Sequence, residues 1–447
     1  MTRTRWLLLA AIIVAIFLPV AYFGSEHFIG RMLETHGVRK LLSGKTAKVL
    51  DCDSGYLPLG SNGRTVWSPG FLGKAAPPRA LTELRAFSLW ARCSLSELWR
   101  AKWRIDVLHV SHLQAAYGEA AASHIDRSEF HPPELKPPLQ TESPLELDIR
   151  LLDVTQLDLY WGTTPERGGE FRKVHAQFFP REHNLAVQGE GGTFHQVKWP
   201  EARLLRCKLF FAKPNLRIDE AALDLGGKGS ISVLGNFRFE EKQSMDLQMK
   251  LSQCPIEPFF GDPSRCKAAG EFDATAHLVK DASQQDSARV TGAIEKTRAV
   301  LQKIETLQKL AAFTGRKELA NLPVDQLKAD YDWNSPVLTV KNLVMESKNI
   351  VVFEGEFVMK DEKVDGEFEL GVAPDLVDKF PGAREEIFTR SERGYLWTRI
   401  ALSGPLTKLH DNLKPRLVKA AQDHFAKGLL APILKPGQSV IEAIQGL

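Results

Sequence analysis

Two histidines that lie three positions apart, His109 and His112, resemble a pair of metal ligands. Histidine nitrogens bind divalent metals when several ligands converge on one point. The alternation of apolar and polar residues around this pair predicts a β-strand, and residues three apart on a strand point to opposite faces. We therefore expect two ordinary strand histidines and no shared metal.

A phosphate loop is suggested by the stretch "SGKT", residues 43–46, but its context does not fit. The motif needs a glycine four residues before the serine, where this chain has Arg39, and it needs a strand before the loop. The residues before Arg39 have helical spacing. We therefore predict no nucleotide site here.

Two pairs of aspartates could do acid–base chemistry or hold a cation, because each pair shares one face of a possible strand. They are Asp51 with Asp53, and Asp330 with Asp332. The simpler interpretation is a solvated sheet face. A hydrolase would need a nucleophile, but the chain has neither Gly-x-Ser-x-Gly nor His-Glu-x-x-His. We expect no catalytic residue, no metal and no cofactor.

The cysteines allow one candidate disulfide. Cys254 and Cys266 flank "PIEPFFGDPSR" and could pair in an oxidising compartment. Alternatively, all five cysteines are small buried apolar residues. There is no Cys-x-x-Cys, so a zinc knuckle or a redox motif is not indicated. The five are Cys52, Cys93, Cys207, Cys254 and Cys266.

The chain of 447 residues is long enough for two domains or for one extended architecture. Its formal net charge is only +3, and no strongly basic run with interleaved aromatic residues occurs. These features give no indication of nucleic-acid binding.

The N-terminus has the pattern of a membrane anchor. Arg3 and Arg5 precede an uncharged apolar run over residues 6–23. This run would span roughly 27 Å as a helix, close to the thickness of a bilayer core. A cleaved signal peptide is the alternative, but the run is long and no small-x-small site follows it. The positive-inside rule places the N-terminus in the cytoplasm and the remainder across the membrane.

Helical spacing occurs in three further places. Residues 25–43 predict a helix that ends at Gly44, and residues 411–447 predict a basic amphipathic tail. In "KTRAVLQKIETLQKLAAFTG" the apolar spacing from Val300 to Ala311 predicts a third helix that stops at Gly315.

Strand patterns dominate the rest. Alternating stretches such as "LELDIRLLDVTQLDLYW", "MDLQMKL" and "LKADYDW" are separated by tight turns, which predicts an antiparallel meander without βαβ units. The fold class is therefore mainly β, a long curved antiparallel sheet over residues 44–410. A Pro-rich stretch at 119–144 predicts an inserted loop.

The tripeptide Gly-x-Phe recurs in these strands, and it belongs to a longer internal repeat. Residues 223–237 resemble residues 343–357. Glycine weakens a strand and often marks a bend, so the repeat predicts one sheet that is extended by repetition and bent at its glycines. The tripeptide starts at Gly169, Gly192, Gly235, Gly270, Gly355 and Gly366.

The hairpin "VVFEGEFVMKDEKVDGEFELGV" at residues 351–372 alternates so that one face is apolar and the other charged. The predicted helices are too few to cover an apolar face that extends over many strands. Either the sheet closes into a sandwich, or the face forms a groove for something else, such as lipid tails.

At this point the chain resembles the AsmA-like family of envelope proteins. The resemblance lies in the anchor and short helix, then "LSGKTAKVLDCDSGYLPLGSNGRTVW" and "LTELRAFSLWARCSLSELWRAKWRIDVLHVSHLQAAYG". It returns in "LAAFTGRKELANLPVDQLKADYDWNSPVLTVKNLVMESKNIVVFEGEF" and "GYLWTRIALSGPL". It consists of alternation and glycines, without a catalytic signature.

The resemblance implies a β-groove that is anchored in the inner membrane and faces the periplasm. The expected segments are an anchor (residues 1–24), a periplasmic helix (25–43), the β-groove (44–410) and the helical tail (411–447). The resemblance also implies a part in phospholipid movement toward the outer membrane, with envelope proteins as possible partners. The alternative is a non-enzymatic envelope assembly scaffold with a closed β-sandwich. The residues expected to contact acyl chains are Val351, Phe353, Phe357, Met359, Val364, Phe368, Leu370 and Val372.

Overall fold

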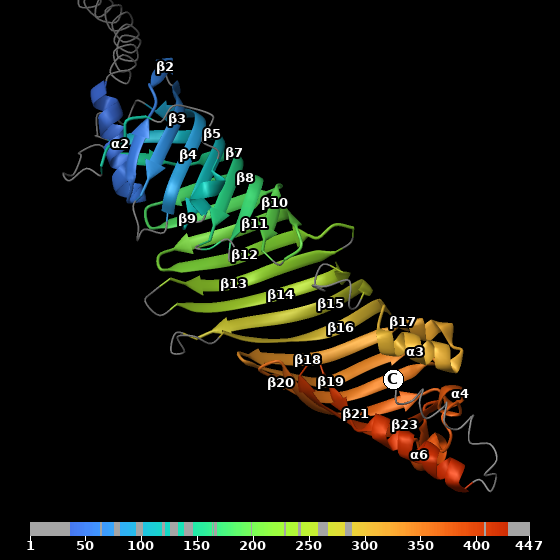
Figure 1. Ribbon diagram of the computed structural model, residues 1–447. Helices are drawn as coiled ribbons and strands as arrows, with labels where there is room; N and C mark the ends of the chain where they lie inside the picture. The colour runs from blue at the N-terminus through green and yellow to red at the C-terminus, as the bar shows by residue number, and fades with distance from the viewer. Residues whose placement is uncertain are drawn as a thin grey trace, which may run out of the picture. The chain divides into compact units, whose positions relative to one another are not determined.

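The protein is mainly β, with a large antiparallel sheet and a few short helices (Figure 1). The chain divides into two compact units, residues 1–213 and 214–447, which are described separately. The predicted anchor and residues 25–35 lie outside the described part of this computed structural model. Described are residues 36–427 except 63–64, 76–80, 95–101, 119–120, 126–132, 138–145, 163, 165–167, 198, 228, 240–242, 258–266, 282–287 and 406–407. None of the helices found there has the length and apolar character needed to cross a membrane.

The first unit begins with one helix, α2 (His36–Leu50), and continues as a sheet. Its early strands are β1 (Asp53–Tyr56), β2 (Gly60–Asn62), β3 (Thr65–Lys74), β4 (Leu81–Ser94) and β5 (Lys102–Tyr117). After the 3₁₀ helix η2 (Ala121–His124) come β6 (Glu146–Ile149), β7 (Leu152–Trp161), β8 (Gly169–Arg181), β9 (Asn184–Glu190), β10 (Thr193–Gln196) and β11 (Ala202–Ala212).

One junction in this sheet departs from the predicted antiparallel meander. Strand β5 pairs in parallel with both β6 and β7, whereas the other described pairings of the first unit are antiparallel. Parallel neighbours need a long crossover connection. The stretch at 119–144, predicted as an insertion, therefore serves as that crossover.

Helix α2 does not end at Gly44, contrary to the prediction, but continues to Leu50. Gly44 is itself buried, and Ala47 in the next turn is fully buried. Packing of that turn outweighs the helix penalty of glycine, which is about 1 kcal/mol. Leu42 joins a core with Val66 and Trp103 from the sheet, so α2 covers one of the two sheet faces.

The second unit contains only antiparallel pairings among its described strands, as predicted. The strands are β12 (Asn215–Asp224), β13 (Ser230–Arg238), β14 (Ser244–Pro255), β15 (Lys267–Lys280), β16 (Ala288–Gln302), β17 (Asn321–Val324), β18 (Gln326–Asn334), β19 (Val337–Ser347), β20 (Val351–Lys360), β21 (Lys363–Val372), β22 (Arg390–Glu392), β23 (Tyr395–Pro405) and β24 (His410–Asp411). Most consecutive strands pair with each other, but β16 pairs with both β17 and β18, and β23 pairs with both β21 and β22.

The helix expected from residue 300 onward is only half right. Val300 lies in strand β16, opposite Pro323 of β17, and helix α3 begins at Glu305. Its end is as predicted, because Gly315 adopts the left-handed conformation (φ 75°) and caps the helix. The β-branched and alternating residues before Glu305 satisfy a strand as well as a helix, and strand pairing decides between them.

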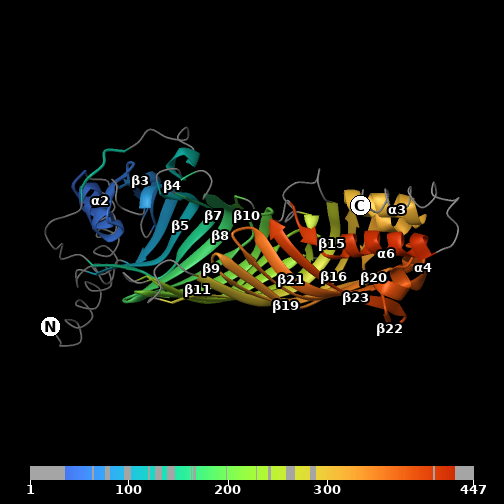
Figure 2. The ribbon, with the colours of Figure 1, turned by 60° about the horizontal axis from the view of Figure 1, so that its bottom comes forward.

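The helices of this unit gather at one end of its strands (Figure 2). They are α3 (Glu305–Thr314), the 3₁₀ helix η5 (Lys317–Ala320), α4 (Pro374–Val377), α5 (Ala383–Glu386) and α6 (Leu413–Lys427). Leu319 and Leu376 form one core with the strand ends, and Val377 and Ala420 form another. The predicted C-terminal helix is thus present as α6, and residues 428–447 lie outside the described part.

Two of the repeated glycines, both in the hairpin β20–β21, are paired with phenylalanines on the neighbouring strand. Gly355 is opposite Phe368, and Phe357 is opposite Gly366. A Cβ atom on Gly355 would lie 2.7 Å from the Phe368 ring, so no side chain fits there. Each ring fills the space that the opposing glycine leaves open.

The two copies of the internal repeat share a further irregularity. The register between β12 and β13 shifts at residues 218–221, beside Gly235. The register between β19 and β20 shifts at residues 340–343, beside Gly355. Such bulges bend the strand that carries them. Each copy therefore combines a bulged strand with a glycine-bearing strand.

Candidate functional site

The eight residues predicted to contact lipid lie on one face of the hairpin β20–β21. The strand register pairs Phe353 with Leu370, Met359 with Val364, and Val351 with Val372. Directly opposed residues of an antiparallel pair share a face. The alternation in the sequence is therefore expressed in the sheet without a slip.

Burial divides these eight residues into two groups. Val364 and Phe368 are buried, whereas the others are half-buried. The rings of Phe353 and Phe368 stack with centroids 4.4 Å apart, and Phe357 lies 6.3 Å from Phe368. This aromatic group holds the centre of the hairpin face in place.

Three of the eight residues pack against the helical end of the second unit. Val351 and Val372 pack against the core that contains Leu319 and Leu376. Leu370 packs against the core that contains Val377. These three residues stabilise the helical end of the unit. Phe353, Phe357 and Met359 lie farther along the strands, outside these two cores.

The apolar face continues from the hairpin over the preceding strands. Two rows of directly opposed residues each cross the seven neighbouring strands β14, β15, β16, β18, β19, β20 and β21. The first row is Leu247, Leu278, Val290, Trp333, Leu338, Met359 and Val364. The second is Met249, Ala276, Gly292, Tyr331, Val340, Phe357 and Gly366. We call these residues the apolar rows.

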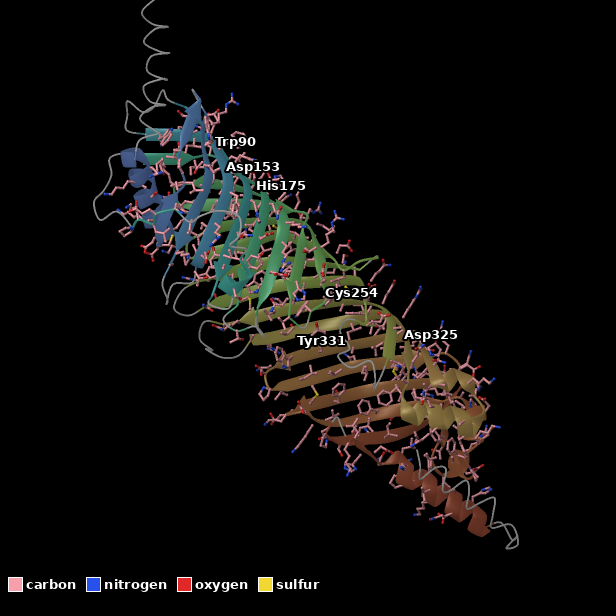
Figure 3. All side chains as sticks on the ribbon, turned by 45° about the horizontal axis from the view of Figure 1, so that its top comes forward. Trp90, Asp153, His175, Cys254, Asp325 and Tyr331 are labelled. Atoms are coloured by element: carbon pink, nitrogen blue, oxygen red, sulfur yellow. The ribbon has the colours of Figure 1, made fainter. Side chains whose placement is uncertain are left out.

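Tyr331 is the one residue of the apolar rows with a hydroxyl group, and this hydroxyl is hydrogen-bonded. Tyr331, labelled in Figure 3, lies over Gly292 and donates its hydroxyl to the carbonyl of Thr275 at 2.9 Å. Trp333 is 42% exposed although it sits within the first row. Trp333 is the penultimate residue of β18, so this accessible aromatic side chain lies at the strand-end edge of the apolar surface.

No second layer packs on the apolar rows among the described elements of the second unit. Strands β13 to β15 contact chiefly their neighbours in the sheet. Helices α3 to α6 pack on the strand ends near Val351 and Val372. Helices therefore cover the apolar face at its helical end. Over the apolar rows, none of the described elements of this unit covers it.

The opposite face of the same strands carries ion pairs, apart from a buried cluster of Val352, Tyr395 and Trp397. Glu354 pairs with Arg393 at 2.8 Å, and Glu367 pairs with Arg399 at 2.9 Å. Exposed pairs of this kind add little stability. Their effect is to make the two faces chemically distinct, with hydrophobic side chains concentrated on one.

His109 and His112 do not converge on one point. His109 Nδ1 lies 2.9 Å from one carboxylate oxygen of Asp153, and His175 Nε2 lies 3.0 Å from the other (Figure 3). His112 Nε2 lies 2.8 Å from Asp158. Within the described residues, no group of three or more possible ligands is arranged to hold a metal.

Both aspartates in this region are stabilised as carboxylates. Burial by itself raises the pKa of Asp153, but hydrogen bonds, led by that from His175, outweigh burial and lower its pKa. Burial also raises the pKa of Asp158, but the hydrogen bonds from His112 and from the backbone N–H of Lys173 together outweigh burial and lower its pKa. These groups tie strands β5, β7 and β8 together.

The two aspartate pairs singled out in the sequence, Asp51 with Asp53 and Asp330 with Asp332, differ in their surroundings. Asp51 lies in the turn after α2 and Asp53 begins β1. Asp332 forms a two-point ion pair with Arg289, with Oδ1 2.9 Å from Nε, and Asp330 accepts a hydrogen bond from Asn342 at 2.7 Å. The latter pair fits the interpretation as a solvated face.

The four described cysteines form no disulfide with one another. Cys52, Cys93 and Cys254 are buried, and Cys207 is half-buried. Burial raises the pKa of Cys93 to about 12, so it is a poor nucleophile. Cys266 lies outside the described residues, so its pairing with Cys254 stays a prediction.

Comparisons with protein-family models, with curated proteins and with solved structures found no match.

The sequence predicts the apolar face of the hairpin but not its extension across the preceding strands. The alternation in "MDLQMKL" and "LKADYDW" was a sufficient signal for strands with one apolar face. The register that aligns Leu247 with Met359 across the sheet depends on turns and bulges, which the pattern does not fix.

Proposed function

We propose that the apolar rows of the second unit bind phospholipid acyl chains, and that the protein supports lipid transport or outer-membrane homeostasis. The observation that carries this proposal is the pair of apolar rows without a second layer among the described elements. A soluble domain rarely leaves so large a hydrophobic face without a partner.

The dimensions and energies suit an acyl chain. Seven strands at about 4.8 Å spacing give a row roughly 29 Å long. An acyl chain spans one leaflet, which is roughly 15 Å of the hydrocarbon core. Burial of a 16-carbon chain gains on the order of 13 kcal/mol gross, at about 0.8 kcal/mol per CH₂. Such a surface lowers the barrier for tails to leave a membrane without any chemical step.

The remaining parts of the proposal come from the sequence. Residues 6–23 anchor the chain in a bacterial inner membrane, the N-terminus is cytoplasmic and the residues after the anchor are periplasmic. The AsmA-like resemblance supports this arrangement and a role between the two membranes. No catalytic residue is required, so we propose a non-enzymatic protein.

The test is mass spectrometry of lipids that co-purify with the full chain in a detergent that is not a phospholipid. Met359→Asp and Phe353→Asp place a charge on the apolar face and are expected to remove stoichiometric phospholipid. Val358→Asp is the matched control, because Val358 is 42% exposed on the charged face of the same strand. It is expected to retain lipid.

Each variant must keep the wild-type circular dichroism spectrum and urea midpoint for its lipid content to count. Loss of lipid in the two face variants alone supports the proposal. A folded wild-type protein without lipid, or equal lipid in all three variants, refutes it and favours the scaffold with a closed sheet.

A further inference from the structure

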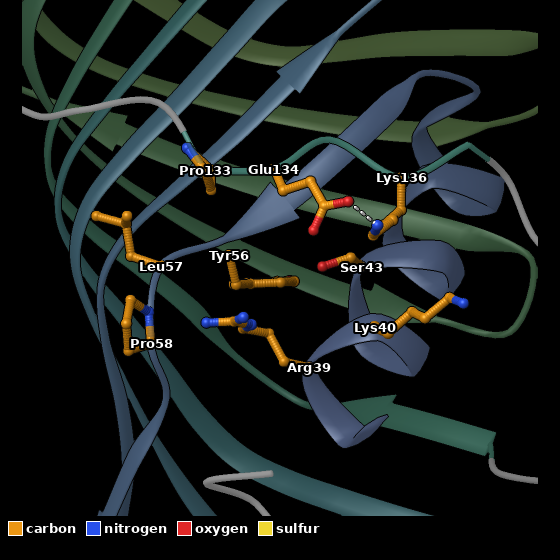
Figure 4. A pocket seen from close by; sticks show the side chains of 9 residues that line it. All are labelled: Arg39, Lys40, Ser43, Tyr56, Leu57, Pro58, Pro133, Glu134 and Lys136. Carbon is orange, nitrogen blue, oxygen red and sulfur yellow. Dashed lines mark hydrogen bonds and ion pairs between the residues drawn. The ribbon is translucent and has the colours of Figure 1, made fainter. Parts of the chain in front are cut away.

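A small pocket in the first unit is lined by basic side chains and is separate from the apolar rows. It lies between helix α2, the residues that follow β1, and the segment 133–136 (Figure 4). It holds about 390 Å³ of empty space, part of which opens to solvent. The lining residues are Arg39, Lys40, Ser43, Tyr56, Leu57, Pro58, Pro133, Glu134 and Lys136.

The wall of this pocket is fixed by backbone contacts. Lys136 donates its backbone N–H to the carbonyl of Ser54 at 2.8 Å, and Ser54 returns a bond of 2.9 Å. Gly55 allows the close approach, since a Cβ atom there would lie 2.4 Å from the carbonyl oxygen of Glu134. The crossover between parallel strands is thus held against β1.

Helix α2 is tied to the same wall. The hydroxyl of Ser54 donates to the carbonyl of Ser43 at 2.6 Å, and Tyr56 OH lies 2.9 Å from Thr46 Oγ1. The side chains that line the pocket therefore stand on three elements that are bonded to one another. A ligand would meet a largely preformed site.

The charges of the lining residues favour an anion. Arg39, Lys40 and Lys136 give three positive charges and Glu134 gives one negative charge, which leaves a net charge of +2. Helix α2 contains further basic residues and no acidic residue. In Figure 4 the Ser43 hydroxyl points toward Tyr56 and adds a neutral donor. Guanidinium, ammonium and hydroxyl donors are the groups that bind phosphate oxygens.

Glu134 occupies part of this anion site. Its carboxylate forms an ion pair with Lys136 (Figure 4). We propose that this pocket binds the phosphate group of a phospholipid headgroup, which takes over the Lys136 ammonium that Glu134 now engages. The proposal rests on the proposed function for the source of the phosphate, because a protein that carries acyl chains also meets their headgroups.

The experiment is calorimetric titration of the full chain with three soluble probes: dihexanoyl phosphatidylglycerol, dihexanoylglycerol, which lacks the phosphate, and inorganic phosphate. Dihexanoyl phosphatidylglycerol is expected to bind at least tenfold more tightly than either of the others. Arg39→Gln is expected to weaken this binding about tenfold, because it removes the planar donor group of the pocket.

Two variants make the test specific. Glu134→Gln removes the internal competitor and is expected to strengthen binding severalfold. Lys48→Gln removes the same charge from α2 at an exposed position that does not line the pocket, and is expected to leave the affinity within twofold of wild type.

The outcomes separate this proposal from the acyl-chain proposal. Equal affinity in Arg39→Gln and Lys48→Gln would overturn the pocket. Equal affinity for inorganic phosphate and the lipid probe would overturn a headgroup as its source. Met359→Asp should still bind dihexanoyl phosphatidylglycerol through the pocket, so loss of co-purifying lipid in that variant concerns the apolar rows alone.

Discussion

Replacement of Phe368 by alanine tests whether the aromatic group at the centre of the hairpin is a structural element. Phe368 is 4% exposed, stacks on Phe353 at 4.4 Å and covers Gly355. Phe→Ala at a buried site costs about 3–5 kcal/mol, from lost transfer free energy and the residual cavity. The strand geometry limits relaxation, because nothing on Gly355 can fill the space. We expect the free energy of unfolding of Phe368→Ala to fall by that amount, measured by urea unfolding of the lipid-free protein.

The control is a double-mutant cycle with Phe353→Ala. Phe353 is only half-buried, so its single replacement should cost less than that of Phe368. The stacked pair should contribute a coupling of about 0.5–1.5 kcal/mol beyond the separate losses. A coupling near zero, or a smaller loss for Phe368→Ala than for Phe353→Ala, would refute the packing described for the hairpin.

Three other perturbations have defined outcomes. Burial raises the pKa of Asp158, but the hydrogen bonds from His112 and the backbone N–H of Lys173 together outweigh burial and lower the pKa in the folded state. The contribution of Asp158 to stability is therefore complete above its ordinary pKa of about 3.9 and declines as the pH falls through the lower folded value. In Asp158→Asn, the unfolding midpoint should therefore fall less steeply with decreasing pH in the acid range than it does in the wild type. An equally steep fall in the variant would contradict this. Cys93, with a pKa of about 12, should resist alkylation by iodoacetamide at pH 8 in the native protein and react after unfolding. Gly270→Ala should destabilise the protein by more than 1 kcal/mol in urea unfolding, since φ is 142° and a Cβ atom would lie 2.0 Å from the carbonyl oxygen of Arg298; a neutral result would mean that the strand can shift.

The sequence was informative where a pattern is local. Period-two alternation located both strands of the 351–372 hairpin and the face to which Phe353 belongs, and Gly315 marked the end of a helix. The sequence pattern gave the wrong element where tertiary contacts determine the secondary structure. Gly44 continues a helix because the next turn is buried, and Val300 joins a strand because β15 and β17 offer partners.

The parallel pairing of β5 with β7 was not accessible from pattern alone. Alternation is the same for parallel and antiparallel neighbours, and only the length of the connection differs. The Pro-rich stretch at 119–144 had that length but was interpreted as an insertion. The pocket was missed for the same reason, because Lys136 and Arg39 become neighbours only when the crossover pairs with Ser54.

The distribution of helices bears on the choice between an open and a closed sheet in the second unit. A closed sandwich needs a second layer that extends over the same strands as the first. The described helices instead pack against strand ends, where Val351, Leu370 and Val372 are incorporated into their cores. The apolar rows lie farther along the same strands, and Trp333 there is accessible. A face that is covered at one end and apolar beyond it has the form expected of a lipid site with a closed end, and this asymmetry makes Met359 a more sensitive test position than Val351.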